Sequence, residues 1–166
     1  MITKDSTPTK EYIYDILSSV PDPEIPVLSV LDLGIVRDVK IEEGNITVVI
    51  TPTYSGCPAM DAIAVNIKAA LQDAGHPNIT IETVLSPAWT TDWMSEEGKR
   101  KLKAYGIAPP EGSVDKNTLL AESRPIPCPR CESTNTELVS QFGSTACKSL
   151  YKCLDCFEPF DYFKCH

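Results

Sequence analysis

Hydrophobic and polar positions follow two different periods in the first part of the chain. Between positions 12 and 20 the hydrophobic residues recur at helical spacing, after a Thr-Pro pair that suits a helix start, and Pro21 ends the pattern. Residues 35–41 and 46–51 alternate instead, with the turn Glu-Glu-Gly-Asn between them. The pattern therefore predicts one helix followed by a β-hairpin.

Helices and strands continue to alternate up to residue 106. Residues 58–73 predict a second helix, and residues 79–85 predict a third strand. A last helix is expected over residues 95–105, with Gly106 as its C-cap. The order α-β-β-α-β-α predicts an α+β fold in which the helices cover one face of a small sheet.

Cysteines divide the chain into two parts. Six of the seven lie between Cys128 and Cys165, whereas Cys57 stands alone. A Pro-Pro-Glu-Gly-Ser run that begins at Pro109 breaks any preceding helix, and an extended Arg-Pro-Ile-Pro segment leads to the first of the six. We therefore expect a first domain over 1–110, a linker over 111–125 that is ordered only around 114–121, and a second domain over 126–166.

Two Cys-x-x-Cys pairs in the second part have the spacing of a metal site. They are Cys128 with Cys131, and Cys153 with Cys156. Each pair can turn two thiolates toward one point, and together the pairs complete the tetrahedral sulfur site that Zn²⁺ accepts. Iron of the rubredoxin type uses the same four ligands, so the spacing leaves the metal open between zinc and iron.

The two strands predicted in this part, 136–141 and 149–153, contain too few residues to build a hydrophobic core. Metal binding would therefore drive the folding of this domain, which we expect to be a small zinc-ribbon β domain. Cys147, Cys165 and His166 are not needed for the four-sulfur site. Cys147 is either a small packed residue or an accessory thiol that exchanges ligands beside the metal.

Cys57 lies between a predicted strand end and a predicted helix start. Gly56 before it lets the backbone approach closely, and Pro58 after it suits the first helical position. Unpaired N–H groups and the helix dipole would stabilise a thiolate there, and the same geometry can hold an anion or a soft metal ion. The alternative is a small buried residue in a tight turn.

An acidic loop stiffened by prolines contains Asp22 and Glu24. Its carboxylates can ligate a metal or meet a partner, or the loop is a solvated turn that Asp22 caps. A second loop carries Trp89 and Trp93 with a methionine, more than a connecting loop needs. These tryptophans either plug the core from its edge or form a partner surface.

Composition restricts the partners and the compartment. The 15 Lys and Arg against 23 Asp and Glu give a net charge of −8 and a pI near 4.7. A protein this acidic is a poor general binder of nucleic acid or of an anionic membrane. The start of the chain has no apolar signal-peptide core, and no stretch is long enough to span a membrane. We therefore expect a cytoplasmic protein whose thiols stay reduced.

Several motifs together resemble two related families. DPEIP at 22–26, DLGIV at 32–36, TPTYSGCPA at 51–59 and SPAWTTDWMSEEGKRKL at 86–102 are similar to the SufT-like iron–sulfur assembly domains. The long aromatic loop and the motifs CPRC, FGSTACKSLYKC and LDC within 128–156 resemble the PaaD family of phenylacetate degradation. The resemblance covers nearly the whole chain.

The resemblance implies an accessory maturation factor, not an enzyme. The expected client is the multicomponent oxygenase that epoxidises the ring of phenylacetyl-CoA, chiefly its iron–sulfur flavin reductase. Cys57 is the functional thiol of the family, and Asp22 and Glu24 belong to its acidic loop. The implied chemistry is transient ligation of iron or of an iron–sulfur cluster, which is delivered to or inserted into the reductase as [2Fe–2S].

The resemblance also implies contact with the iron–sulfur assembly machinery and a homodimer. One alternative from another class stays open. It is a structural or electron-transfer subunit of the oxygenase, with rubredoxin-like iron in the ribbon. Zinc has no redox chemistry, so the identity of the ribbon metal separates the two interpretations.

Overall fold

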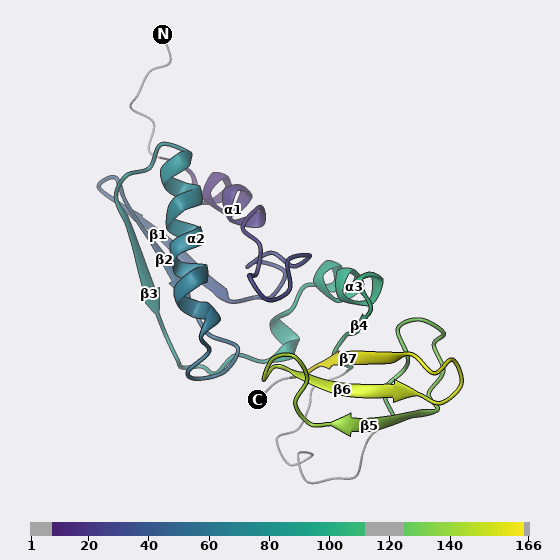
Figure 1. The fold of residues 1–166 in the computed structure, drawn as a ribbon. Helices are drawn as coiled ribbons and strands as arrows, with labels where there is room; N and C mark the ends of the chain where they lie inside the picture. Colours follow the sequence, from purple (N-terminus) through teal and green to yellow (C-terminus); the bar gives the residue numbers. More distant parts are fainter. Residues whose placement is uncertain (1–7, 112–124, 165–166) are drawn as a thin grey trace.

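The computed structural model describes residues 8–111 and 125–164. Its first sheet has the strand order β1-β2-β3, in which β1 and β2 are antiparallel and β2 and β3 are parallel. The chain order of the first elements is the predicted one (Figure 1). They are α1 (Lys10–Ser18), β1 (Val36–Glu42), β2 (Asn45–Ile50), α2 (Ala59–Asp73) and β3 (Ile79–Thr83).

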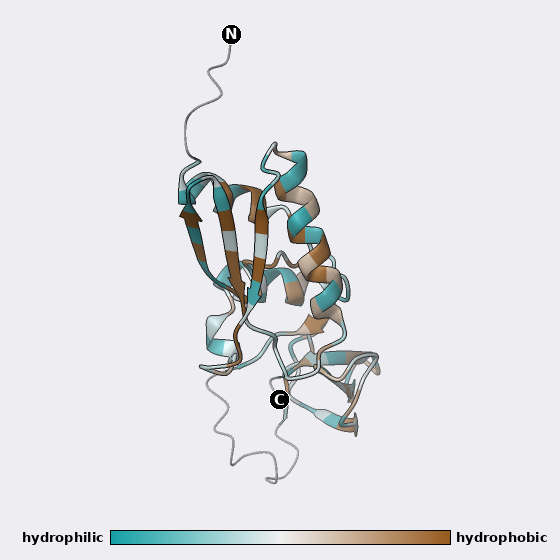
Figure 2. Cartoon of the chain, turned by 90° about the vertical axis from the view of Figure 1, so that its left-hand side faces the viewer, coloured by the Kyte–Doolittle hydropathy of each residue, from teal (hydrophilic) through white to brown (hydrophobic). Residues whose placement is uncertain are grey.

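Both α1 and α2 lie on the same side of this sheet (Figure 1), and Figure 2 shows α2 against its face. The buried side of α2 carries Ile63, Ile67 and Leu71 at helical spacing, and it packs in one hydrophobic cluster with Val39 of β1 and Val48 of β2. The predicted α+β layer fold is therefore confirmed for this part of the chain.

The last predicted helix, α3 (Glu96–Tyr105), is also confirmed with its predicted C-cap, and Ser95 is its N-cap. The Ser95 hydroxyl accepts a hydrogen bond from the backbone N–H of Gly98 at 2.9 Å. Gly106 ends the helix with a φ of 94°, a left-handed conformation that favours glycine. This helix lies away from the first sheet and beside the second one (Figure 1).

A second, four-stranded sheet has the order β4-β7-β6-β5. Two of its strands, β5 and β6, were expected from the sequence, whereas β7 was missed. Its strands are β4 (Ile107–Ala108), β5 (Thr136–Ser140), β6 (Lys148–Cys153) and β7 (Pro159–Phe163).

The shortest strand, β4, comes from residues that the sequence assigns to the first domain. It pairs in parallel with β7, so the ribbon sheet includes a strand from before residue 110. Two residues are too few to carry a periodic signal, and only the partner strand makes them a strand. Most of the predicted linker, including the piece expected at 114–121, lies outside the described residues.

Hydrophobic contacts join the two parts of the molecule. Cys147 and Phe163 of the second part belong to the same buried cluster as α1 and α2. The ring of Phe163 meets that of Trp89 edge-on, with 6.1 Å between the ring centroids. An ion pair between Lys103 of α3 and Glu132 adds a polar contact. Among the described residues, no helix is long and apolar enough to cross a membrane.

Candidate functional site

The acidic loop between α1 and β1 is shaped by Asp22. One oxygen of its carboxylate, Oδ1, accepts the backbone N–H of Glu24 at 2.9 Å and that of Ile25 at 2.7 Å. The Asp22 side chain is buried, and this burial raises its pKa despite the two N–H donors. Asp22 therefore caps the turn, as one interpretation of the sequence expected, but its carboxylate is buried while the prolines of the loop are exposed.

Cys57 lies where β2 leads into α2. Gly56 has a φ of 82°, which turns the loop, and the backbone N–H of Cys57 donates to the carbonyl of Tyr54 at 3.3 Å. Pro58 is the N-cap and Ala59 the first helical residue, one position later than the sequence predicted. Cys57 is thus half-buried directly before the helix N-cap.

Cys57, Asp22 and Glu24 line one small cavity of about 20 Å³. A third element, from the second part of the chain, adds Cys147 to the same cavity. The structure therefore brings together the three residues that the sequence and the family resemblance singled out. The remaining lining is mostly apolar: Ile25, Leu33, Ile35, Thr53, Ala59, Met60, Ile63 and Phe163.

Cys147 was expected either in a packed position or beside the ribbon metal. It is buried, and it lies at the Cys57 cavity and not among the four cysteines of the metal group. Its Sγ is 3.0 Å from Oγ1 of Thr145 and 3.8 Å from Oε2 of Glu24. Burial raises the pKa of this thiol, and the carboxylate of Glu24 raises it further.

Tyr54 reports the electrostatic character of the cavity. Burial raises the pKa of Tyr54 to about 12, together with the Glu24 carboxylate and the Cys57 and Cys147 thiols once these are ionised. These groups would disfavour an additional anion and favour a cation. The site therefore suits a positively charged, sulfur-seeking metal more than a phosphate.

The two tryptophans of the aromatic loop differ in burial. Trp89 is only 3% exposed, and its indole N–H donates to the carbonyl of Leu33 at 2.8 Å. Its assignment to a partner surface is wrong, because the aromatic ring fills the core and its polar atom is satisfied there. Trp93 is half-buried under the guanidinium of Arg37, which is 3.5 Å from the ring centroid. A partner surface at Trp93 stays a prediction.

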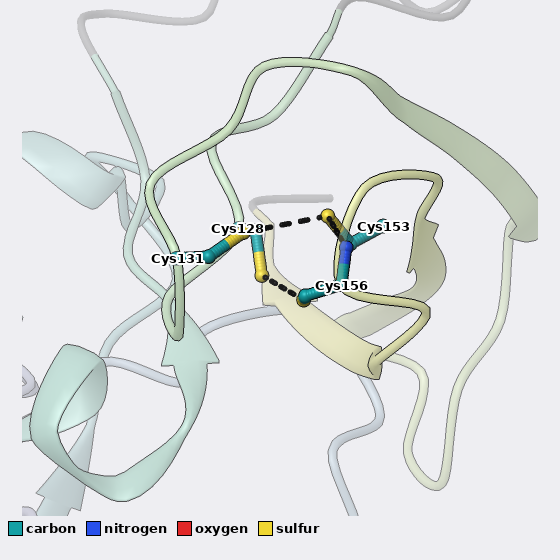
Figure 3. A group of neighbouring side chains, drawn as sticks. All are labelled: Cys128, Cys131, Cys153 and Cys156. Carbon is teal, nitrogen blue, oxygen red and sulfur yellow. Dashed lines mark hydrogen bonds between the residues drawn. The ribbon is translucent and has the colours of Figure 1, made fainter.

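The four predicted metal ligands meet at one point, two from each of two loops (Figure 3). The Sγ atoms of Cys128 and Cys156 are 3.7 Å apart, and those of Cys131 and Cys153 are 3.6 Å apart. Tetrahedral Zn–S bonds of about 2.3 Å would place the sulfurs roughly 3.8 Å apart. These two distances fit a tetrahedral metal ion, and all four sulfurs lie within 4.8 Å of one another.

Backbone and side-chain contacts support these loops. The N–H of Cys156 points at the sulfur of Cys153 and lowers the pKa of that thiol to about 7. Asn135 donates to Asp155 at 2.8 Å, and Ser133 also contacts this carboxylate. Such outer contacts orient metal ligands before the ion binds.

Comparisons with known proteins agree with this architecture. Residues 10–83 match a family described as iron–sulfur cluster assembly proteins, and residues 112–164 match the PaaD zinc beta ribbon domain. An Escherichia coli relative that is named as a component of 1,2-phenylacetyl-CoA epoxidase is 48% identical over 95% of this chain and 94% of its own length.

Shorter relatives match only part of the chain. A Porphyromonas gingivalis protein named an Fe-S protein maturation auxiliary factor is 38% identical over 57% of this chain and 90% of its own length. The solved structure of a domain of unknown function from Bacillus anthracis has 30% identity and a TM-score of 0.53, covering 56% of this chain and 90% of that one.

The fold and the two cysteine sites thus define an iron–sulfur cluster assembly domain joined to a metal-binding ribbon. Within that class, the chain belongs to the PaaD family. The names of the relatives support a role in iron–sulfur assembly or maturation, and those of the shorter relatives describe auxiliary factors, not enzymes.

Proposed function

We propose that this protein matures phenylacetyl-CoA epoxidase by delivering an iron–sulfur cluster to the reductase component through Cys57. The observation that carries the proposal is the cavity that Cys57 lines together with Asp22 and Glu24. Thiolate is the usual protein ligand of iron–sulfur clusters, and the half-buried Cys57 is accessible enough to release its cargo.

The size of the cavity supports transient ligation. A volume of about 20 Å³ accommodates a single water-sized atom or ion, which is smaller than a cluster of several iron and sulfur atoms. A cluster bound at Cys57 would therefore keep most of its atoms outside the cavity, unless the surrounding loops move apart. Cargo that is held at one side only can be passed on by ligand exchange.

We assign zinc to the four ribbon cysteines, with a structural role. A closed site of four thiolates leaves no position for a substrate, and zinc does not change its oxidation state. Metal analysis of protein purified without oxygen is expected to find one zinc per chain in the ribbon. Iron in place of zinc would favour the electron-transfer subunit instead.

The maturation role is tested on the reductase itself. Reductase produced with the wild-type protein is expected to contain normal iron, acid-labile sulfide and flavin. Reductase produced with Cys57→Ser, or without the protein, is expected to keep its flavin and lose most of its cluster. Ser55→Ala is the matched control, because Ser55 is exposed in the same loop.

A reductase with full cluster content after maturation by Cys57→Ser would contradict the role of the Cys57 thiol. Normal cluster content in the complete absence of the protein would contradict the choice of the reductase as client. Contact with the assembly machinery and formation of a homodimer remain separate predictions, which neither outcome changes.

A further inference from the structure

We propose that Cys57 and Cys147 bind the iron cargo together, with Glu24 as a third donor, so that the ribbon supplies a ligand to the assembly domain. This inference rests on the proposed function, because it takes iron as the cargo. It assigns Cys147 a role that neither the single-domain relatives nor the four-cysteine site requires.

The position of Cys147 in the chain separates it from the zinc ligands. It comes directly before β6, and Cys153 ends the same strand. Six residue steps of about 3.3 Å place the two ends of an extended strand roughly 20 Å apart. One end of β6 thus reaches the Cys57 cavity, and the other end holds the ribbon metal.

The ribbon fixes Cys147 in place at this cavity. The carbonyl of Cys147 accepts the backbone N–H of Lys164 at 2.9 Å, next to Phe163 at the end of β7. Cys147 is only 5% exposed, and its Sγ lies 3.8 Å from Oε2 of Glu24, while Cys57 lines the cavity from the first domain. Packing alone does not explain a carboxylate at this distance from a buried thiol, whereas a shared metal ion would use both groups as ligands.

Charge in the cavity also points to a cation. Two thiols and the carboxylates of Asp22 and Glu24 line it, and the lysines that act on Cys147 are Lys148 and Lys164. If both thiols lost their protons, four negative charges would face two positive ones. A divalent ion would balance the two excess negative charges. Without such an ion, burial makes this excess charge unfavourable.

The chemistry of these donors matches iron and differs from that of the ribbon. Binding of Fe²⁺ would break two S–H bonds and form two Fe–S bonds, and two protons would leave to solvent. The oxidation state of the iron does not change, so no oxidant is required. Two thiolates and one carboxylate leave a coordination position open, where sulfide or a ligand of the client can enter.

The ligand atoms of Cys57, Cys147 and Glu24 must move to reach one ion. Among the described residues, only the four ribbon cysteines have ligand atoms that already lie within 4.8 Å of one another as a group. Closure around an ion would therefore draw Cys57 toward Cys147 and Glu24. This requirement distinguishes a site that loads and unloads from the preformed structural site.

Cobalt is the probe of choice for the test. Co²⁺ resembles Fe²⁺ in its ligands and gives thiolate charge-transfer bands, and zinc binds more tightly than cobalt to the same donors. Full-length protein with zinc in the ribbon would be titrated with Co²⁺ without oxygen. X-ray absorption at the cobalt edge is expected to find two sulfur donors, and one or none would overturn the proposal.

Variants test each ligand separately. Cys147→Ala and Cys57→Ser are each expected to weaken Co²⁺ binding at least tenfold and to remove about half of the charge-transfer intensity that the wild type shows at saturation. Thr145→Val is the matched control, because it changes a neighbour of the Cys147 sulfur and keeps both thiols. Zinc content and melting temperature verify that each variant is folded.

The outcomes separate this inference from the proposed function. Loss of binding in Cys57→Ser alone, with Cys147→Ala unchanged, would overturn the shared site and leave Cys57 as the cargo thiol. Unchanged binding in both variants would contradict both proposals. Reconstitution with Fe²⁺, with and without sulfide, then distinguishes a single iron from a cluster. Iron binding that requires both thiols and also requires sulfide identifies the cluster.

Discussion

Asp32 and Gly34 form a tight turn beside the tryptophan loop. The Asp32 carboxylate accepts hydrogen bonds from the hydroxyl of Ser95 at 2.9 Å and from the ammonium of Lys101 at 2.7 Å. Burial by itself would raise the pKa of Asp32, but these donors outweigh it and hold the pKa below its usual value of 3.8. Its stabilising effect is therefore present above pH 3.8 and is lost as the pH falls below that value.

Gly34→Ala tests the close approach in this turn. Gly34 has a φ of 69°, and a Cβ there would lie 2.1 Å from the carbonyl oxygen of Trp93. Gly44 has a φ of 81°, but its surroundings are open. In urea unfolding, Gly44→Ala is expected to cost about 1 kcal/mol, from the positive φ alone. Gly34→Ala should cost several-fold more, and equal losses would contradict the clash.

At the scale of elements, α3 is tied to the turn that contains Asp32 and to the ribbon. Ser95 caps the helix and also donates to Asp32, and Lys103 near its other end pairs with Glu132 next to the metal ligand Cys131. The helix therefore links the core around Asp32 to the metal loop of the ribbon.

Ser95→Ala is expected to destabilise the protein more than Thr9→Ala. Both residues are N-caps, and the loss of a cap typically costs about 1 kcal/mol. Removal of the Ser95 hydroxyl also takes a hydrogen bond from the part-buried Asp32 carboxylate, which should add about another 1 kcal/mol. Denaturant midpoints measure both variants, and a larger loss in Thr9→Ala would contradict the coupling to Asp32.

Across the whole molecule, the two metal-related sites are connected through β6 and β7. These strands carry Cys147 and Phe163 into the hydrophobic cluster of the first domain, while the loops beyond the other end of β6 hold the metal ligands. A domain of this size depends on its metal for folding. Loss of the ribbon metal should therefore also change the structure around the Cys57 cavity.

Removal of the zinc is expected to expose Cys57. Alkylation of the half-buried Cys57 should become several-fold faster after a chelator removes the ribbon metal, because Phe163 and Cys147 would no longer cover the cavity. The rate is measured by mass spectrometry of the peptide that contains Cys57, and restoring zinc provides the control. An unchanged rate in metal-free protein would show that the first domain keeps its cavity without the ribbon.

Much of the local structure follows from the sequence by itself. The helical period around Ile13, the Glu-Glu-Gly-Asn turn and the caps of α3 are decided by neighbours within a few residues, so the pattern predicts them. The ribbon ligands belong to the same category, because the spacing within each Cys-x-x-Cys pair brings two sulfurs together. Cys57, Asp22 and Glu24 were marked by their motifs.

Only the tertiary structure decided which distant segments meet. Trp89 fills the core, β4 joins the ribbon sheet, and Cys147 lies across a cavity from Cys57. Each of these depends on contacts between residues far apart in the chain, and no local period or spacing encodes them. The sequence by itself determined the residue types of the four-cysteine group and marked Cys57, and the packing of the ribbon against the first domain determined that Cys147 lines the cavity of Cys57.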